Sequence, residues 1–201
     1  MTDTDTLSTR ERLLRSAAEL MRDGGFASAS VGAIAERAGL ARGALYRHFP
    51  SKAELFVEVF RAVGEHELSA MHAASAQSAG FAQRFEAVIT TYALSALRNR
   101  RLAWALVYEP VDALVDAERL VYRRRYRDDM AQLLRDGVAV QAIPTQNVEL
   151  TAAAVVGAIA EALVGPLSPV AGRTPDDTEI VAAILGFCRR AIGMEQTTGR
   201  N

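Results

Sequence analysis

Apolar side chains recur every three or four positions along most of this 201-residue chain, a spacing that is typical of helices packed on one face. The pattern predicts helices over about 8–25, 31–38, 42–49, 52–71, 80–98, 100–108, 112–136, 147–164 and 176–194, separated by glycine, proline and polar clusters. We find no segment in which apolar and polar residues alternate as they do in a half-buried strand. The sequence therefore predicts an all-α fold.

One segment near the N-terminus has the pattern of two short helices, a tight turn and the start of a third helix. Ser30 can cap the first helix, and Gly39 stands at its end, where a left-handed residue commonly closes a helix. Pro50 ends the second helix, because the residue before a proline avoids helical geometry. Ser51 and Glu54 then form a capping box for the next helix. This order is typical of helix-turn-helix proteins, whose second helix lies in the major groove of DNA.

The second helix of this pair carries polar residues on its outward face. These residues are Arg42, Tyr46, Arg47 and His48, and Lys52 follows one turn later. Arginine can hydrogen-bond the edge of guanine, and the other side chains can reach phosphate oxygens. A solvated helix face would also carry such charges. The glycine turn together with the run Tyr-Arg-His-Phe-Pro-Ser-Lys favours DNA binding.

At these residues the chain resembles the tetracycline-repressor (TetR) family of bacterial transcription regulators. The similarity lies in Ile34-Ala35-Glu36-Arg37-Ala38-Gly39, Gly43, Leu45-Tyr46 and Phe49-Pro50-Ser51-Lys52, within about the first quarter of the chain. The resemblance implies a three-helix DNA-binding domain over residues 1–51 and a helical ligand-binding and dimerisation domain over residues 52–201. It also implies a homodimeric repressor that leaves its operator when a small molecule binds.

The resemblance implies roles for seven residues. Those at positions that approach bases or the adjacent backbone are Arg42, Gly43, Tyr46 and Arg47, and those near phosphates are Ser30, His48 and Lys52. Gly32 stands where many members carry a base-reaching polar residue, and Ala41 and Ala44 replace a phosphate-binding serine and threonine. We therefore expect sequence choice to depend mainly on Arg42 and Arg47.

The last two predicted helices are rich in apolar and small residues. Both could bury this surface within their own subunit. The resemblance, in which these helices form a four-helix bundle across a dimer, favours an interface that includes Val156, Ile159, Ala160, Leu163, Ile184, Phe187 and Cys188. A palindromic operator would follow, read by two recognition helices about 34–36 Å apart.

Aromatic residues of the middle helices are candidates for contacts to an unidentified small-molecule effector. They are Phe85, Tyr92, Trp104, Tyr108 and Tyr122. Aromatic rings with polar tips commonly line apolar pockets, although most aromatic residues at helical spacing belong to a core. A basic run, 123–127, lies on one of these helices. A solvated or ion-paired role is favoured for it over a DNA contact or an anion site.

Composition narrows the class of protein. Half of the residues are hydrophobic, 23% are charged and the net charge is −1, but residues 7–56 hold eight basic and five acidic residues. The slight positive charge of this N-terminal segment suits binding to the negatively charged DNA backbone. The single cysteine, Cys188, excludes an intrachain disulfide and suits a reducing cytoplasm. We expect a disordered tail over residues 1–7, no signal peptide and no membrane partner, and hence a cytoplasmic protein.

Enzyme chemistry is not indicated. The three histidines lack the spacing of metal ligands, and the chain has no phosphate-binding glycine loop or nucleophile motif. We therefore expect no catalytic residue, metal or cofactor. Two alternatives stay open: a helix-turn-helix activator or a regulator triggered by a protein partner, and an all-helical ligand-binding protein that does not use DNA.

Overall fold

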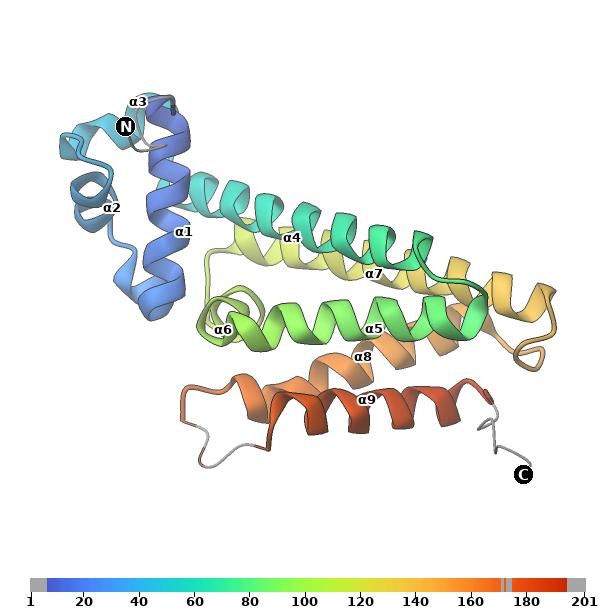
Figure 1. Cartoon of the computed structure of the whole chain (residues 1–201). Helices are drawn as coiled ribbons and strands as arrows, with labels where there is room; N and C mark the ends of the chain where they lie inside the picture. The colour runs from blue at the N-terminus through green and yellow to red at the C-terminus, as the bar shows by residue number, and fades with distance from the viewer. Residues whose placement is uncertain (1–6, 171, 173–174, 195–201) are drawn as a thin grey trace. The chain divides into compact units, whose positions relative to one another are not determined.

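The computed structural model describes residues 7–170, 172 and 175–194, which form helices and no strand (Figure 1). The helices are α1 (Thr9–Ser28), α2 (Val31–Arg37), the 3-10 helix η2 (Arg42–Ala44), α3 (Leu45–His48), α4 (Lys52–Ala76), α5 (Phe81–Arg98), α6 (Arg100–Tyr108), α7 (Ala113–Ala139), α8 (Val148–Leu167) and α9 (Asp177–Ala191). The all-α prediction is confirmed. The predicted disordered tail over 1–7 lies, apart from Leu7, outside the described residues.

The chain forms two compact units. The first comprises the residues up to His66, Asn99–Tyr122 and Leu167–Pro169, and the second comprises Glu67–Arg98, Arg123–Pro166 and the residues from Val170 onward. The chain passes from one unit to the other within α4 and again within α7. The predicted domain boundary at residue 51 is a functional one, between a DNA-binding and an effector-binding domain. It stays a prediction.

A capping box starts α1 as the sequence predicts. The Ser8 hydroxyl accepts from the Glu11 amide at 3.3 Å, and the Ser8 amide donates to the Glu11 carboxylate at 2.8 Å. Hydrogen bonds from the Ser8 side chain and backbone favour the ionised form and lower the pKa of Glu11. The helix continues beyond its predicted end to Ser28, through a kink at Gly25, whose φ is 72°.

The core of the N-terminal region consists of apolar side chains from α1, α2 and the segment after the turn. Fully buried members are Leu13, Ala17, Met21, Ile34, Leu45 and Phe49. Their spacing on α1, α2 and α3 matches the predicted apolar faces, so burying them fixes the turn between α2 and η2 against α1.

In the second unit, α9 packs against α5 (Figure 1). The helix before it, α8, continues through Gly165 and Pro166 to Leu167, beyond its predicted end at 164. One of the clashes that a proline causes, with the Cβ of the residue before it, is absent here because Gly165 has no Cβ. Among the described residues, α8 alone is long and apolar enough to cross a membrane. Length and composition do not separate such a helix from one in a soluble core.

Candidate nucleic-acid interface and internal cavity

A left-handed glycine closes α2 and sets the turn that follows. Gly39 has φ 65°, its amide donates to the Glu36 carbonyl at 2.9 Å, and the Leu40 amide donates to the Ala35 carbonyl at 2.9 Å. These two bonds form a Schellman motif, in which the residue after the C-cap must adopt positive φ. The predicted role of Gly39 is confirmed.

The helix after the turn is less regular than predicted. Instead of one helix over 42–49, the chain forms the 3-10 turn η2, one α-helical turn in α3, and extended backbone at Phe49. Ala41 precedes η2 and has no side-chain oxygen, so no side chain caps this helix. Turns of 3-10 geometry are frequent at the ends of α-helices.

The side chains predicted to bind DNA lie at the surface of this region. Six of them are exposed, with Tyr46 at 59%: Ser30, Arg42, Gly43, Tyr46, Arg47 and His48. Lys52 is half-buried, and its ammonium group lies 5.0 Å from the centroid of the Phe56 ring. Ser30 accepts from the Ala33 amide at 3.1 Å, which leaves its hydroxyl hydrogen to donate outward.

The cations near the turn differ in whether the chain itself supplies a partner. Three arginines form ion pairs within the chain: Arg10 with Glu58, Arg15 with Glu19 and Arg37 with Asp23. A fourth, Arg12, donates a hydrogen bond to the Ala38 carbonyl. By contrast, within the described residues no carboxylate pairs with Arg42, Arg47 or Lys52. These three positive charges are therefore available to an external anion.

The Arg42 side chain lies next to Gly32. A Cβ added to Gly32 would lie 3.5 Å from Nε and from Nη2 of Arg42, which is ordinary van der Waals contact. The guanidinium therefore lies beside the first turn of α2. Gly32 itself offers no side chain for base readout, and a cation from η2 occupies the adjacent space.

A polar cluster ties the end of α1 to α6 within the first unit. Glu109 accepts from the Phe26 amide at 2.9 Å and pairs with Arg101 at 2.5 Å, and Arg101 donates to the Gly24 carbonyl at 2.8 Å. A Cβ at Gly25 would lie 2.3 Å from Arg101 Nη2 and 2.4 Å from Glu109 Oε1. Glycine at this position is therefore required both by φ and by space.

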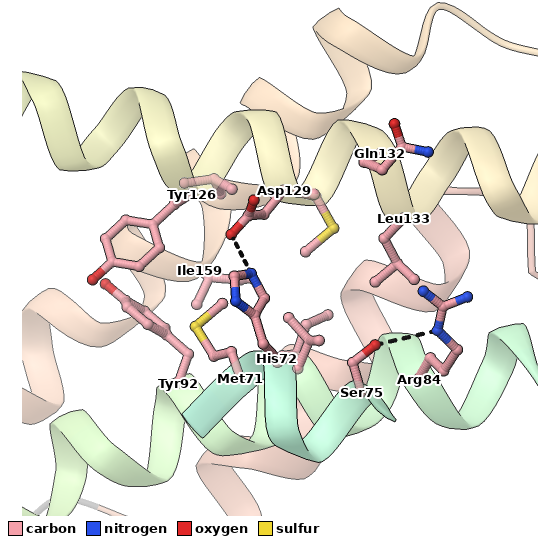
Figure 2. Close-up of a pocket in the computed structure, with 14 residues that line it drawn as sticks. Met71, His72, Ser75, Arg84, Tyr92, Tyr126, Asp129, Gln132, Leu133 and Ile159 are labelled. Atoms are coloured by element: carbon pink, nitrogen blue, oxygen red, sulfur yellow. Dashed lines mark hydrogen bonds and ion pairs between the residues drawn. The ribbon is translucent and has the colours of Figure 1, made fainter. Parts of the chain in front are cut away.

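The second unit contains a cavity of about 180 Å³ between its part of α4, α5, α7 and α8 (Figure 2). Its apolar lining includes Met71, Val88, Ile89, Met130, Leu133 and Ile159. Its polar lining consists of His72, Ser75, Arg84, Tyr92, Tyr126, Asp129 and Gln132. The cavity thus combines an apolar wall with a polar margin, as small-molecule sites commonly do.

Two polar pairs lie along that margin, as Figure 2 shows. His72 Nε2 lies 2.8 Å from Asp129 Oδ2. Arg84 donates to the Ser75 hydroxyl at 3.2 Å and to Asp136 at 3.2 Å. Both pairs connect different helices.

The aromatic rings of Tyr92 and Tyr126 meet edge to face at the same cavity, with centroids 5.5 Å apart. The Tyr126 hydroxyl donates to Glu67 at 2.8 Å. This bond fixes the ring of Tyr126 relative to α4.

A shallow groove of about 870 Å³ runs between α8 and α9. Small and apolar residues line it, among them Ala158, Ala162, Ala183 and Phe187, whose side chain is 51% exposed. Cys188 lies at its base, and burial raises the pKa of this thiol to about 11. A thiol with so high a pKa is a structural rather than a reactive group at neutral pH.

Comparison with known proteins agrees with the helix-turn-helix geometry. Residues 13–59 match the family model of bacterial regulatory proteins, tetR family. The helix-turn-helix segment therefore belongs to the TetR family. The curated relatives that share this segment are named as transcription regulators, in agreement with the expectation that the chain is not an enzyme.

Two curated relatives share the N-terminal part of this chain. The HTH-type transcriptional regulator AcrR of Shigella flexneri is 39% identical over 71 residues, which cover 33% of this chain and 33% of AcrR. The HTH-type transcriptional activator FasR of Mycolicibacterium smegmatis is 32% identical over 83 residues, which cover 41% of this chain and 38% of FasR. The matched parts are thus 33% and 38% of the lengths of these relatives.

Solved structures share the fold over nearly the whole chain. The fatty acid degradation regulator FadR of Bacillus halodurans has a TM-score of 0.79 at 14% identity and covers 97% of this chain and 99% of its own. FadR of Bacillus subtilis, solved in complex with stearoyl-CoA, has a TM-score of 0.77 at 17% identity and covers 92% and 99%. At such low identity the likeness concerns the fold.

The residues predicted to contact an effector are dispersed over both compact units. Tyr92 lines the cavity, whereas Phe85 is fully buried and stacks on Phe81. The other three predicted residues, Trp104, Tyr108 and Tyr122, belong to the first compact unit and do not line this cavity. Tyr122 is buried and donates to Glu65 at 2.7 Å.

Sequence reasoning missed the polar margin of the cavity. His72 and Ser75 lie one turn apart on α4, and Tyr126, Asp129 and Leu133 recur at three- and four-residue spacing on α7. That spacing places polar and apolar residues on one helix face. This mixture could have indicated a ligand site from the sequence, because a helix face that packs into an ordinary core carries no charged residues.

The predicted dimer residues divide by burial. Ile159, Leu163, Ile184 and Cys188 are buried within the chain's own second unit. Val156 and Ala160 are half-buried, and Phe187 is exposed. In the basic run, Arg123, Arg124 and Arg127 are exposed, and Arg127 donates to the Arg123 carbonyl at 3.2 Å.

Proposed function

We propose that this protein is a TetR-family transcription regulator that binds DNA through α2, η2 and α3 and responds to a small molecule. The observation that carries the proposal is the contrast between its cations. Arg42, Arg47 and Lys52 lack a carboxylate partner among the described residues, whereas the arginines of α1 and α2 next to them are paired within the chain, apart from Arg22. Unpaired cations on a surface fixed by a Schellman turn suit phosphate and base contacts.

The proposed form is a homodimer on a palindromic operator. The exposed Phe187 beside the small residues of the α8–α9 groove supports a second copy on this face. Two copies related by a two-fold axis would place two recognition helices in successive major grooves. The proposed sites of DNA contact are Ser30, Arg42, Gly43, Tyr46, Arg47, His48 and Lys52.

The proposed response is release of DNA, as in a repressor, when an effector enters the cavity of the second unit. The B. subtilis FadR structure, which has the same fold, was solved in complex with stearoyl-CoA. That complex supports a small-molecule effector for this chain. The proposed location of the protein is the cytoplasm. Activation is the second candidate, because the FasR relative is a transcriptional activator.

Operator selection tests the DNA-binding proposal. The purified chain is incubated with a random double-stranded DNA pool, and the recovered fragments are sequenced. We expect one palindrome, and we expect Arg42→Ala and Arg47→Ala to change the preferred bases. No enrichment at moderate salt, or unchanged preference in both variants, would contradict the proposed readout.

A further inference from the structure

We propose that the cavity of the second unit binds a small amphipathic cation, with an aromatic or similarly compact apolar body inside and a quaternary or protonated amine at the His72–Asp129 margin. The inference rests on the proposed function in one respect: the ligand acts as an effector only if the protein is a regulator. The binding itself follows from the size, charge and chemistry of the cavity.

The volume limits the apolar body. An apolar protein cavity of about 150 Å³ binds benzene, and sites for drug-sized ligands occupy about 300–1,000 Å³. The cavity here is about 180 Å³. A single ring or a short branched chain therefore fills it, and a larger body would have to displace the lining side chains.

The two polar pairs at the margin differ in charge. Arg84 and Asp136 carry opposite full charges, so that pair is neutral in sum, and Ser75 also binds the guanidinium. His72 balances Asp129 only when its imidazole is protonated. With a neutral imidazole, the His72–Asp129 pair leaves one negative charge at the cavity, and a cationic head group would compensate it.

The position of Asp129 suits a head group at the edge rather than in the interior. The Asp129 side chain is 40% exposed and that of His72 is 63% exposed. A cation bound there keeps part of its hydration while its apolar body occupies the cavity, as long amphipathic side chains do at protein surfaces.

The other lining residues favour the same class of ligand. Tyr92 and Tyr126 present aromatic rings, which attract cations through their faces. Met71 and Met130 contribute thioethers, which pack well against aromatic rings. An anion would meet these rings and Asp129 unfavourably, and Arg84 is already bound by Ser75 and Asp136.

Three probes that share one aromatic ring and differ in their head group test the charge of the ligand. Benzyltrimethylammonium, benzyl alcohol and benzoate are titrated into the full chain without DNA, and binding is measured by calorimetry. We expect the cation to bind tightest and benzoate weakest. Asp129→Asn should weaken the cation by about fivefold and leave benzyl alcohol nearly unchanged. Asp128→Asn, which changes an exposed neighbour that does not line the cavity, is the matched control and should alter neither.

A second pair of variants tests the aromatic contribution. Tyr92→Phe keeps a ring and should retain cation binding, whereas Tyr92→Leu should weaken it. Tightest binding by benzoate, no binding by any probe, or equal effects of Asp129→Asn and Asp128→Asn would overturn the inference. Binding of the cation without any change in DNA affinity would support the inference and contradict the proposed effector role, so the two failures are distinguishable.

Discussion

A substitution at Gly43 should affect the stability of the free protein and its affinity for DNA differently. Nothing lies within 4 Å of a Cβ added at Gly43, which sits in η2 at the exposed surface. Alanine should therefore leave the free protein as stable or stabilise it by about 0.4–1 kcal/mol, because it restricts the unfolded chain. If the backbone approaches DNA at this position, the added methyl group should weaken operator binding by about tenfold, or about 1.4 kcal/mol.

Thermal unfolding and a fluorescence-anisotropy titration of Gly43→Ala measure the two effects separately. A variant with unchanged stability and unchanged DNA affinity would remove Gly43 from the interface. A variant that loses both would contradict the open space around its Cβ.

The ability to predict single residues from the sequence differs between the surface and the cavity. Gly39 was predictable because a helix that must turn sharply needs a residue of positive φ. Phe85 and Tyr92 carry the same kind of sequence signal, yet one lies in the core and the other at a cavity. Only the packing of α5 against its neighbours separates them, and helical spacing does not encode that packing.

At the scale of elements, the kink in α1 depends on a glycine that other side chains enclose. Gly25 has φ 72°, and a Cβ there would lie within 2.4 Å of Arg101 and Glu109 atoms. We expect Gly25→Ala to destabilise the protein by about 2 kcal/mol, since positive φ strains alanine and the ion pair must move. In a chain of this size that corresponds to a fall in Tm of roughly 4–8 °C. Gly43→Ala is the matched control, and an equal Tm in both variants would refute the requirement for glycine.

Helix existence followed from the sequence more reliably than helix ends. The periodic apolar stripes of α5 and α6 gave segments close to the observed Phe81–Arg98 and Arg100–Tyr108. The ends of α1 and α8 were misplaced because Gly25 and Gly165-Pro166 look like breakers, although tertiary contacts and the absence of a Cβ let the helices continue. The segment 42–49 was predicted as one helix, and it begins with a 3-10 turn after Ala41, which has no side chain that could cap it.

At the scale of the whole molecule, the oligomeric state depends on how the α8–α9 face is covered. Phe187 is an apolar ring with 51% of its surface exposed, beside a groove of small residues. Leu120 is equally apolar and 63% exposed, but it lies on α7 in the first unit. The two residues therefore form a matched pair for testing which surface joins two copies.

We expect the wild-type chain to have twice the mass of one chain in light scattering at micromolar concentration. Phe187→Glu would place a charge in the proposed interface, where an unpaired buried carboxylate costs several kcal/mol, and should shift the protein to monomer. Leu120→Glu should leave the dimer intact. In a dimer, the DNA-binding regions of both copies bind the two halves of a palindrome together. The monomeric variant should therefore also lose most of its operator affinity, while it keeps weak, salt-sensitive DNA binding. A wild-type monomer, or a Phe187→Glu variant that remains dimeric, would show that the α8–α9 face is not the site of association.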